Sequence, residues 1–162
     1  MKYLFNLQNA LTRILMGVGG LSLIAIMLLT VVDVGGRFFK YPLFGTVELV
    51  GFLAVISVAA ALPHTYKVDG HVGVELFLRL LPLRVRLWIE LFTRILSLGL
   101  FTVISWQMFL YAADLKQSGE VSMNLEFPVH YIVFLLALGL LIFSVTIVQR
   151  IVATLTLIKT KE

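Results

Sequence analysis

Four long stretches of the chain contain no Asp, Glu, Lys or Arg, and the charged residues gather between them. The stretches cover residues 14–32, 49–66, 95–113 and 127–149, and each is 18 to 23 residues long. An α-helix rises about 1.5 Å per residue, so about 20 apolar residues cross a hydrocarbon core about 30 Å thick. These runs are continuous, whereas a membrane β-strand alternates apolar and polar positions. The pattern therefore predicts an all-α membrane protein with four transmembrane helices.

Composition supports the same fold class. Hydrophobic residues make up 60% of the chain and the mean hydropathy is +1.01, against about 45–50% apolar residues in a soluble domain. The first apolar run is too long for the core of a signal peptide and no small-residue cleavage site follows it, so we expect it to be retained as a span. The spans are expected at about 14–32, 47–66, 95–113 and 127–149, in a single membrane domain over residues 1–162.

The distribution of charge predicts the orientation. Ten of the 13 basic residues lie in the two terminal segments or between the second and third spans. Basic residues concentrate on the cytoplasmic side of membrane proteins, so we expect both termini and the middle segment to be cytoplasmic. The loops after the first and third spans carry three basic and five acidic residues and are expected on the opposite side. An even number of spans fits this assignment at every loop.

The middle segment, residues 71–94, has an amphipathic pattern typical of a helix that lies at the cytoplasmic membrane surface. Pro82 suits the first turn of a new helix, which we expect to run unbroken into the third span. Arg86, Glu90 and Arg94 then fall four residues apart on one face and predict a ladder of ion pairs. The candidates for contact with lipid headgroups and the cytoplasmic interface are Arg79, Arg84, Arg86, Trp88 and Arg94.

The first outer loop, residues 33–48, contains three glycines and a proline and is expected to turn rather than to continue as helix. Glu48 lies at the start of the second span, where a carboxylate favours the positive end of the helix dipole. We expect Arg37 to pair with it across the loop and hold the loop against the second span. Contact with a partner protein is the alternative role for both residues.

The second span carries small residues that suit close helix packing. Ala54, Ser57 and Ala61 follow one another at i, i+3 and i+7, and small side chains let helix backbones approach closely in lipid. The candidates for a partner interface are therefore these three residues together with charged residues of the outer loops, namely Arg37, Lys40, Glu48 and Glu120.

The sequence lacks the motifs that most catalytic and cofactor-binding sites require. The chain has no cysteine, no glycine-rich phosphate loop, no cluster of metal ligands and no nucleophile elbow, so we expect neither an enzyme nor a bound cofactor. His64, His71 and His130 do not suit a haem held by two histidines, because His130 is expected at the opposite membrane surface. The basic middle segment adjoins two spans and fits lipid headgroups better than nucleic acid.

The middles of the spans contain no ionisable residue, which bears on transport. A carrier that couples ions to substrate by itself is expected to place a charge or a broken helix near the membrane centre. The sequence therefore favours a supporting membrane subunit. Two alternatives remain at this point: a self-sufficient small multidrug-type secondary carrier, and a membrane-anchor or cytochrome subunit.

Several short motifs, in this order and spacing, resemble the small membrane subunit of tripartite ATP-independent periplasmic (TRAP) transporters, the DctQ-like family. The resemblance covers nearly the whole chain. The motifs are Gly-Gly-Arg-Phe-Phe at 35–39, Glu-Leu at 48–49, Asp-Gly-His-Val-Gly-Val-Glu at 69–75, Leu-Pro at 81–82, Ser-Gly-Glu-Val-Ser at 118–122 and Pro128.

The resemblance implies a role in a three-part, sodium-driven symport system of the bacterial inner membrane that takes up organic acids. In that family a periplasmic binding protein delivers the substrate, and a large membrane subunit of about twelve spans holds the sodium and substrate sites. The small subunit is a static scaffold that packs against the large subunit and shares the docking surface for the binding protein. The implied partners are these two proteins and membrane phospholipids, with no nucleic acid.

Overall fold

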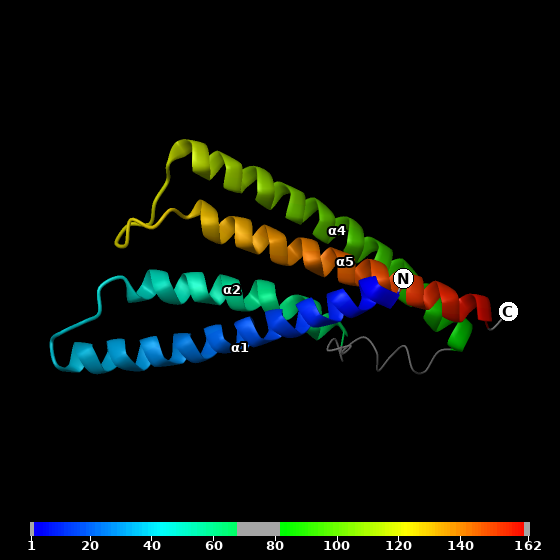
Figure 1. Cartoon of the computed structure of the whole chain (residues 1–162), viewed down its shortest axis with the longest axis horizontal. Helices are drawn as coiled ribbons and strands as arrows, with labels where there is room; N and C mark the ends of the chain where they lie inside the picture. Colours follow the sequence, from blue (N-terminus) through cyan, green and yellow to red (C-terminus); the bar gives the residue numbers. More distant parts are fainter. Residues whose placement is uncertain (1, 68–81, 161–162) are drawn as a thin grey trace.

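A computed structural model of the chain describes residues 2–67 and 82–160, which form four long helices (Figure 1). Each helix contains a stretch that is long and apolar enough to cross a membrane. The only β-structure within the described residues is an isolated bridge between Val121 and Pro128. The predicted all-α fold with four candidate membrane spans is confirmed. The helices are α1 (Lys2–Phe38), α2 (Thr46–Lys67), α4 (Leu83–Ser118) and α5 (His130–Thr160).

Helix α4 confirms the prediction of one continuous helix that leads into the third span. Pro82 lies immediately before its first residue, and Leu83–Ser118 follow without a break. The first part of the predicted amphipathic segment, residues 71–81, lies outside the described residues. Helix α4 ends at Gly119, whose left-handed backbone (φ 68°) lets its N–H bond to the carbonyl of Leu115.

The prediction that the first outer loop begins at Asp33 was wrong, because α1 continues to Phe38. Glycines are tolerated in membrane helices, where a broken helix would leave backbone groups without partners. The helix ends in a Schellman motif: Tyr41 N–H donates to Gly36 O at 2.8 Å, and Lys40 N–H donates to Arg37 O at 3.1 Å. A Cβ on Gly36 would meet Tyr41 O at 2.3 Å, so this ending requires glycine.

The four helices form an open row rather than a closed bundle. Helix α1 packs on α2, α2 packs on α5, and α5 packs on α4, so α1 and α4 lie at the two edges (Figure 1). Both edge helices bury few of their residues within the chain. The α1–α2 and α4–α5 connections lie together at one end, here called the loop end, and the two termini lie towards the other, the terminal end.

The helices form two hairpins, α1 with α2 and α4 with α5. Small residues make the contacts between these hairpins and within them. Where α1 meets α2, a Cβ on Gly19 would lie 3.3 Å from Ser57 O. Where α2 meets α5, a Cβ on Gly139 would lie 2.8 Å from the Cβ of Ala59 and 2.9 Å from its carbonyl oxygen. Helices α4 and α5 are joined by a hydrogen bond of 3.0 Å from Ser105 Oγ to Ala137 O. The core therefore consists of these seams between neighbouring helices.

Candidate functional site

At the loop end, the carboxylate of Glu48 holds the connection between α4 and α5. Its Oε1 accepts hydrogen bonds from Asn124 N (2.7 Å) and Asn124 Nδ2 (2.9 Å), and its Oε2 accepts one from Leu125 N (3.0 Å). Glu48 lies in the first turn of α2, so its backbone is held by the helix. One side chain therefore joins the start of α2 to the connection between α4 and α5.

The α4–α5 connection presents these amides because it folds back on itself. Ser122 N–H donates to Phe127 O at 2.9 Å, and Phe127 N–H donates to Ser122 Oγ at 3.2 Å. Glu126 has a left-handed backbone (φ 51°), which closes the turn. The closed turn directs the N–H groups of two consecutive residues at its tip, Asn124 and Leu125, towards the same carboxylate. We name residues 119–129 the outer hairpin, after the orientation that the charge distribution predicts.

The two connections at the loop end also pack against each other. Gly45 has a left-handed backbone (φ 73°), and a Cβ placed on it would lie 2.6 Å from Leu125 Cδ2. The rings of Phe52 and Phe127 lie 5.6 Å apart. Close packing and the Glu48 hydrogen bonds thus both join the α1–α2 hairpin to the α4–α5 connection, which makes the loop end a single surface built from both hairpins.

The predicted pairing of Arg37 with Glu48 was wrong. Arg37 Nε forms an ion pair of 2.8 Å with Asp33 Oδ2, one turn earlier in α1. Because α1 continues past Asp33, the two residues lie four apart on one helix, which is the favourable spacing for such a pair. The other oxygen of Asp33 accepts a hydrogen bond from Leu43 N at 3.1 Å, so this carboxylate also holds the connection. The Arg37 side chain remains 59% exposed.

Lys40 and Glu120, the other charged candidates in the outer loops, are exposed. Within the described residues, no hydrogen bond or ion pair joins either side chain to Glu48 or Arg37. Sequence reasoning missed the exposed apolar side chains around them. These are Phe38 at the end of α1, then Phe39, Tyr41 and Phe44 of the α1–α2 connection, each at least 71% exposed, and Met123 at the tip of the outer hairpin, 97% exposed.

The three small residues predicted on α2 do not share one environment. Ser57 is buried and its Oγ donates to Gly19 O at 3.2 Å, so it belongs to the contact with α1. Ala54 and Ala61 are exposed and lie seven residues apart on another face. That face is exposed along the whole helix, and its small and β-branched residues leave it with low relief. We name it the α2 stripe: Val47, Gly51, Ala54, Val58, Ala61 and Thr65.

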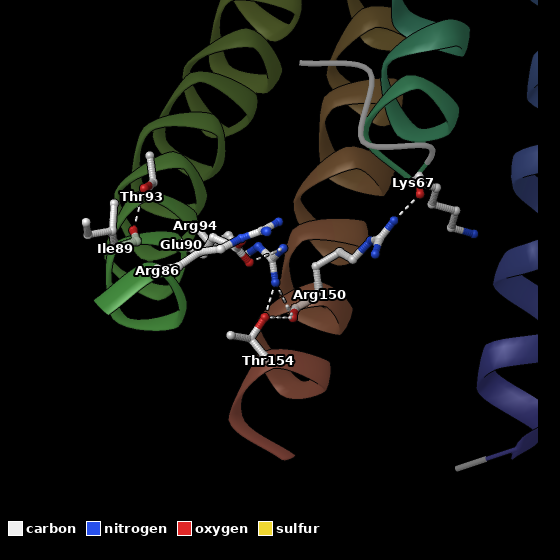
Figure 2. A network of polar contacts seen from close by, with 8 residues as sticks. All are labelled: Lys67, Arg86, Ile89, Glu90, Thr93, Arg94, Arg150 and Thr154. Atoms are coloured by element: carbon white, nitrogen blue, oxygen red, sulfur yellow. Dashed lines mark hydrogen bonds and ion pairs between the residues drawn. The ribbon is translucent and has the colours of Figure 1, made fainter. Parts of the chain in front are cut away.

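At the terminal end, the predicted ladder on α4 is confirmed and extends to neighbouring helices (Figure 2). Glu90 accepts from Arg86 Nε at 2.8 Å and from Arg94 Nη2 at 3.3 Å. Arg94 Nη1 also donates to Arg150 O at 3.1 Å and to the hydroxyl of Thr154, both on α5. The ladder therefore joins α4 to α5.

The same set of contacts continues to α2 and α1. Arg150 donates from Nη2 to the backbone carbonyl of Lys67, and Lys67 Nζ donates to Thr12 Oγ1 at 2.9 Å. Sequence reasoning missed Lys67 and Arg150 as members, because they lie more than 50 residues from their partners and no local spacing reveals them. We name Lys67, Arg86, Glu90, Arg94 and Arg150 the terminal-end network.

The remaining interface candidates of this region are described only in part. Trp88 is 61% exposed on α4. Arg79 lies outside the described residues, and so does the side chain of Arg84. His64 lies near the end of α2 at the terminal end, whereas His130 begins α5 at the loop end, so they face opposite ends of the molecule. Within the part that the structure describes, no three His, Asp or Glu side chains form a group that could hold a metal ion.

Comparison with known proteins gives the chain its family. No curated protein matches it. The model of one family matches residues 26–157, which cover most of the chain and all of the loop end described above; that family is the DctQ component of tripartite ATP-independent periplasmic transporters. Together with the four membrane-length helices, this match shows that the chain belongs to the DctQ family, as a multi-pass membrane component of a tripartite transporter and not an enzyme.

Proposed function

We propose that the chain is the small scaffold subunit of a sodium-coupled TRAP transporter that takes up organic acids across the bacterial inner membrane. Family membership supports this assignment, and the open row of helices is the observation that carries the scaffold role. A row with two unpartnered edge helices offers broad apolar faces to a neighbour. Within the described part of the chain, charged side chains gather at the two ends of the row, which leaves its middle without a group to couple ions.

In this proposal the large membrane subunit contains the sodium and substrate sites, and the small subunit supports it. The α2 stripe is the contact we propose for a helix of the large subunit, because exposed small residues permit close helix approach in lipid. The loop end is proposed to face the periplasm and to border the docking surface for the substrate-binding protein. There the exposed side chains of Arg37, Lys40 and Glu120 surround the surface that Glu48 holds together.

Co-purification with the large subunit tests the scaffold role. Gly51→Leu on the α2 stripe is expected to reduce recovery of the large subunit strongly, because the added side chain keeps a partner helix at a distance. Ala54→Leu combined with Ala61→Leu is expected to act in the same way. Gly99→Leu on α4 is the matched control, because both glycines are exposed and a Cβ at either Gly51 or Gly99 meets nothing within 4 Å. Equal recovery from the Gly51→Leu and Gly99→Leu variants would contradict the assigned contact.

Labelling of single cysteines tests the proposed orientation, and the natural chain contains no cysteine that would interfere. Met123→Cys at the exposed tip of the outer hairpin is expected to react with a membrane-impermeant maleimide in intact cells. A cysteine added after Glu162 is expected to react only after the cells are permeabilised. The reverse pattern would place the loop end in the cytoplasm and exclude it as a dock for a periplasmic protein.

A further inference from the structure

Helix α4 has two faces, and only one of them is used within the chain. It lies at an edge of the row, where its one extensive contact in the described structure is with α5 (Figure 1). Leu91, Ser105 and Ala112 are buried on the side towards that neighbour. Another face carries a row of exposed residues that no element of the described chain covers. We name it the α4 seam: Thr93, Leu96, Leu100, Val103, Gln107 and Leu110.

The spacing of the α4 seam is that of a helix pair. Its members follow one another at alternating steps of three and four residues, from Thr93 to Leu110. In the seven-residue repeat of a coiled coil, Thr93, Leu100 and Gln107 take the a positions, and the other three members take the d positions. A seam of this period stays against a second helix over several turns when the two wind around each other with a left-handed twist, which is common among membrane helices.

Gln107 places an amide on this seam deep in the membrane. It lies three residues from the middle of the charge-free run 95–113, so about 10 Å of hydrocarbon separates it from the nearer headgroups. Its side chain is exposed, and within the described residues no hydrogen bond reaches it. The hydroxyl of Thr93, by contrast, donates to the Ile89 carbonyl of its own helix. An amide without a partner in hydrocarbon is costly, so Gln107 calls for a polar group from outside the chain.

We propose that the α4 seam binds the α4 seam of a second copy of this chain, with the two Gln107 amides hydrogen-bonded to each other. Two copies inserted in the same direction are related by a twofold axis along the membrane normal, so each a position meets itself. A carboxamide both donates and accepts, which makes it complementary to a second carboxamide. A single polar residue at an a position also fixes the register of such a pair. The contact uses a different helix from the α2 stripe and does not depend on the transporter role.

Energy transfer between donor- and acceptor-labelled copies of the full chain in liposomes tests the proposal, with the dye on a cysteine added after Glu162. Transfer by the wild type is expected to rise and saturate as the protein-to-lipid ratio increases. Gln107→Leu is expected to weaken the association constant about tenfold, the effect of losing one or two hydrogen bonds between membrane helices. Gln107→Asn keeps the amide and is expected to keep most of the association. Circular dichroism checks that every variant retains its helices.

The matched control is Thr102→Leu, which removes another exposed polar side chain of α4 at nearly the same depth but outside the seam. It is expected to leave the association unchanged. An equal loss in this variant would show that exposed polarity alone drives the association and would overturn the assigned seam. A wild type that transfers no energy beyond random proximity, or a Gln107→Leu variant that associates like the wild type, would overturn the proposal as well.

Oxidative cross-linking locates the contact in membranes that contain the complete transporter, since the natural chain has no cysteine. Val103→Cys lies on the seam and is expected to yield dimers of the chain linked by a disulfide. The neighbouring Thr102→Cys is exposed on another face and is expected to yield none. A helix of the large subunit is the rival occupant. If Val103→Cys gives no dimer, and Gln107→Leu instead lowers recovery of the large subunit on co-purification, the seam belongs to that subunit and the proposal fails.

Discussion

Replacing Gly139 with alanine is expected to weaken the contact between α2 and α5. The new Cβ would lie 2.8 Å from the Cβ of Ala59, 2.9 Å from its carbonyl oxygen and 3.2 Å from its carbonyl carbon. Two of these three atoms belong to the backbone of α2, so no side-chain rotation relieves the overlap. The two helices must move apart along the only extensive contact between the hairpins in the described structure.

The expected loss in the free energy of unfolding is about 1–3 kcal/mol, the usual effect of overpacking a tight contact. Steric trapping of the purified protein in bicelles measures it. Gly99→Ala is the control, because its new Cβ meets nothing within 4 Å; a better helix former there is expected to be neutral or to stabilise by up to about 1 kcal/mol.

A second substitution separates overpacking from other effects of the alanine. Ala59→Gly removes the nearer carbon atom but leaves the backbone carbonyl in place. The double variant Ala59→Gly with Gly139→Ala is therefore expected to recover part of the lost stability, and the double-mutant cycle gives the coupling between the two positions. Additive effects of the two changes, or equal destabilisation by Gly99→Ala, would contradict the packing explanation.

The helical spans were predictable from sequence because the membrane requirement acts on each span separately. Each backbone group inside lipid must bond within its own helix, so an apolar run of sufficient length is enough to identify a span. The ladder of Arg86, Glu90 and Arg94 was predictable for the same reason, since its members lie on successive turns of one helix. The prediction for the end of α1 was wrong. Gly35 and Gly36 indicated a turn, but the helix continues through them and the ion pair between Asp33 and Arg37 forms on it.

Contacts between helices could not be predicted in the same way. A hydrogen bond joins Glu48 and Asn124 although 76 positions separate them, and another joins Arg94 and Thr154 across 60 positions. Their meeting depends on the order of helices in the row, which hydropathy does not encode. The same is true of Ser57: its size suggested a packing face, but only the arrangement of α1 beside α2 shows that Ser57 lies inside the chain while Ala54 and Ala61 lie outside.

Replacing Glu48 with lysine is expected to release the outer hairpin from α2. The carboxylate accepts three hydrogen bonds, two of them from the backbone N–H groups of Asn124 and Leu125. An ammonium group at that position is itself a donor and repels all three. Hydrogen exchange is expected to become about tenfold faster or more at these two amides, because bonds to a charged acceptor are among the stronger ones. The helices themselves should retain their protection, since their backbone bonds are internal.

Glu120→Lys is the matched control, because it makes the same charge change on an exposed side chain of the outer hairpin. It is expected to leave exchange at Asn124 and Leu125 unchanged. If Glu48→Lys does not alter that exchange either, the carboxylate does not hold the hairpin in solution.

Transport measurements then connect this contact to the proposed function. In cells that contain the complete transporter, Glu48→Lys is expected to reduce substrate uptake while the amount of the chain in the membrane stays constant. A surface for a docking protein must keep its parts in register, and Glu48 joins the start of α2 to the outer hairpin by hydrogen bonds. Faster exchange together with normal uptake would mean that the position of the outer hairpin does not matter for docking, and the dock would have to be sought on another part of the assembly. Reduced uptake in both Glu48→Lys and Glu120→Lys would instead assign the effect to the charge of the loop end rather than to its architecture.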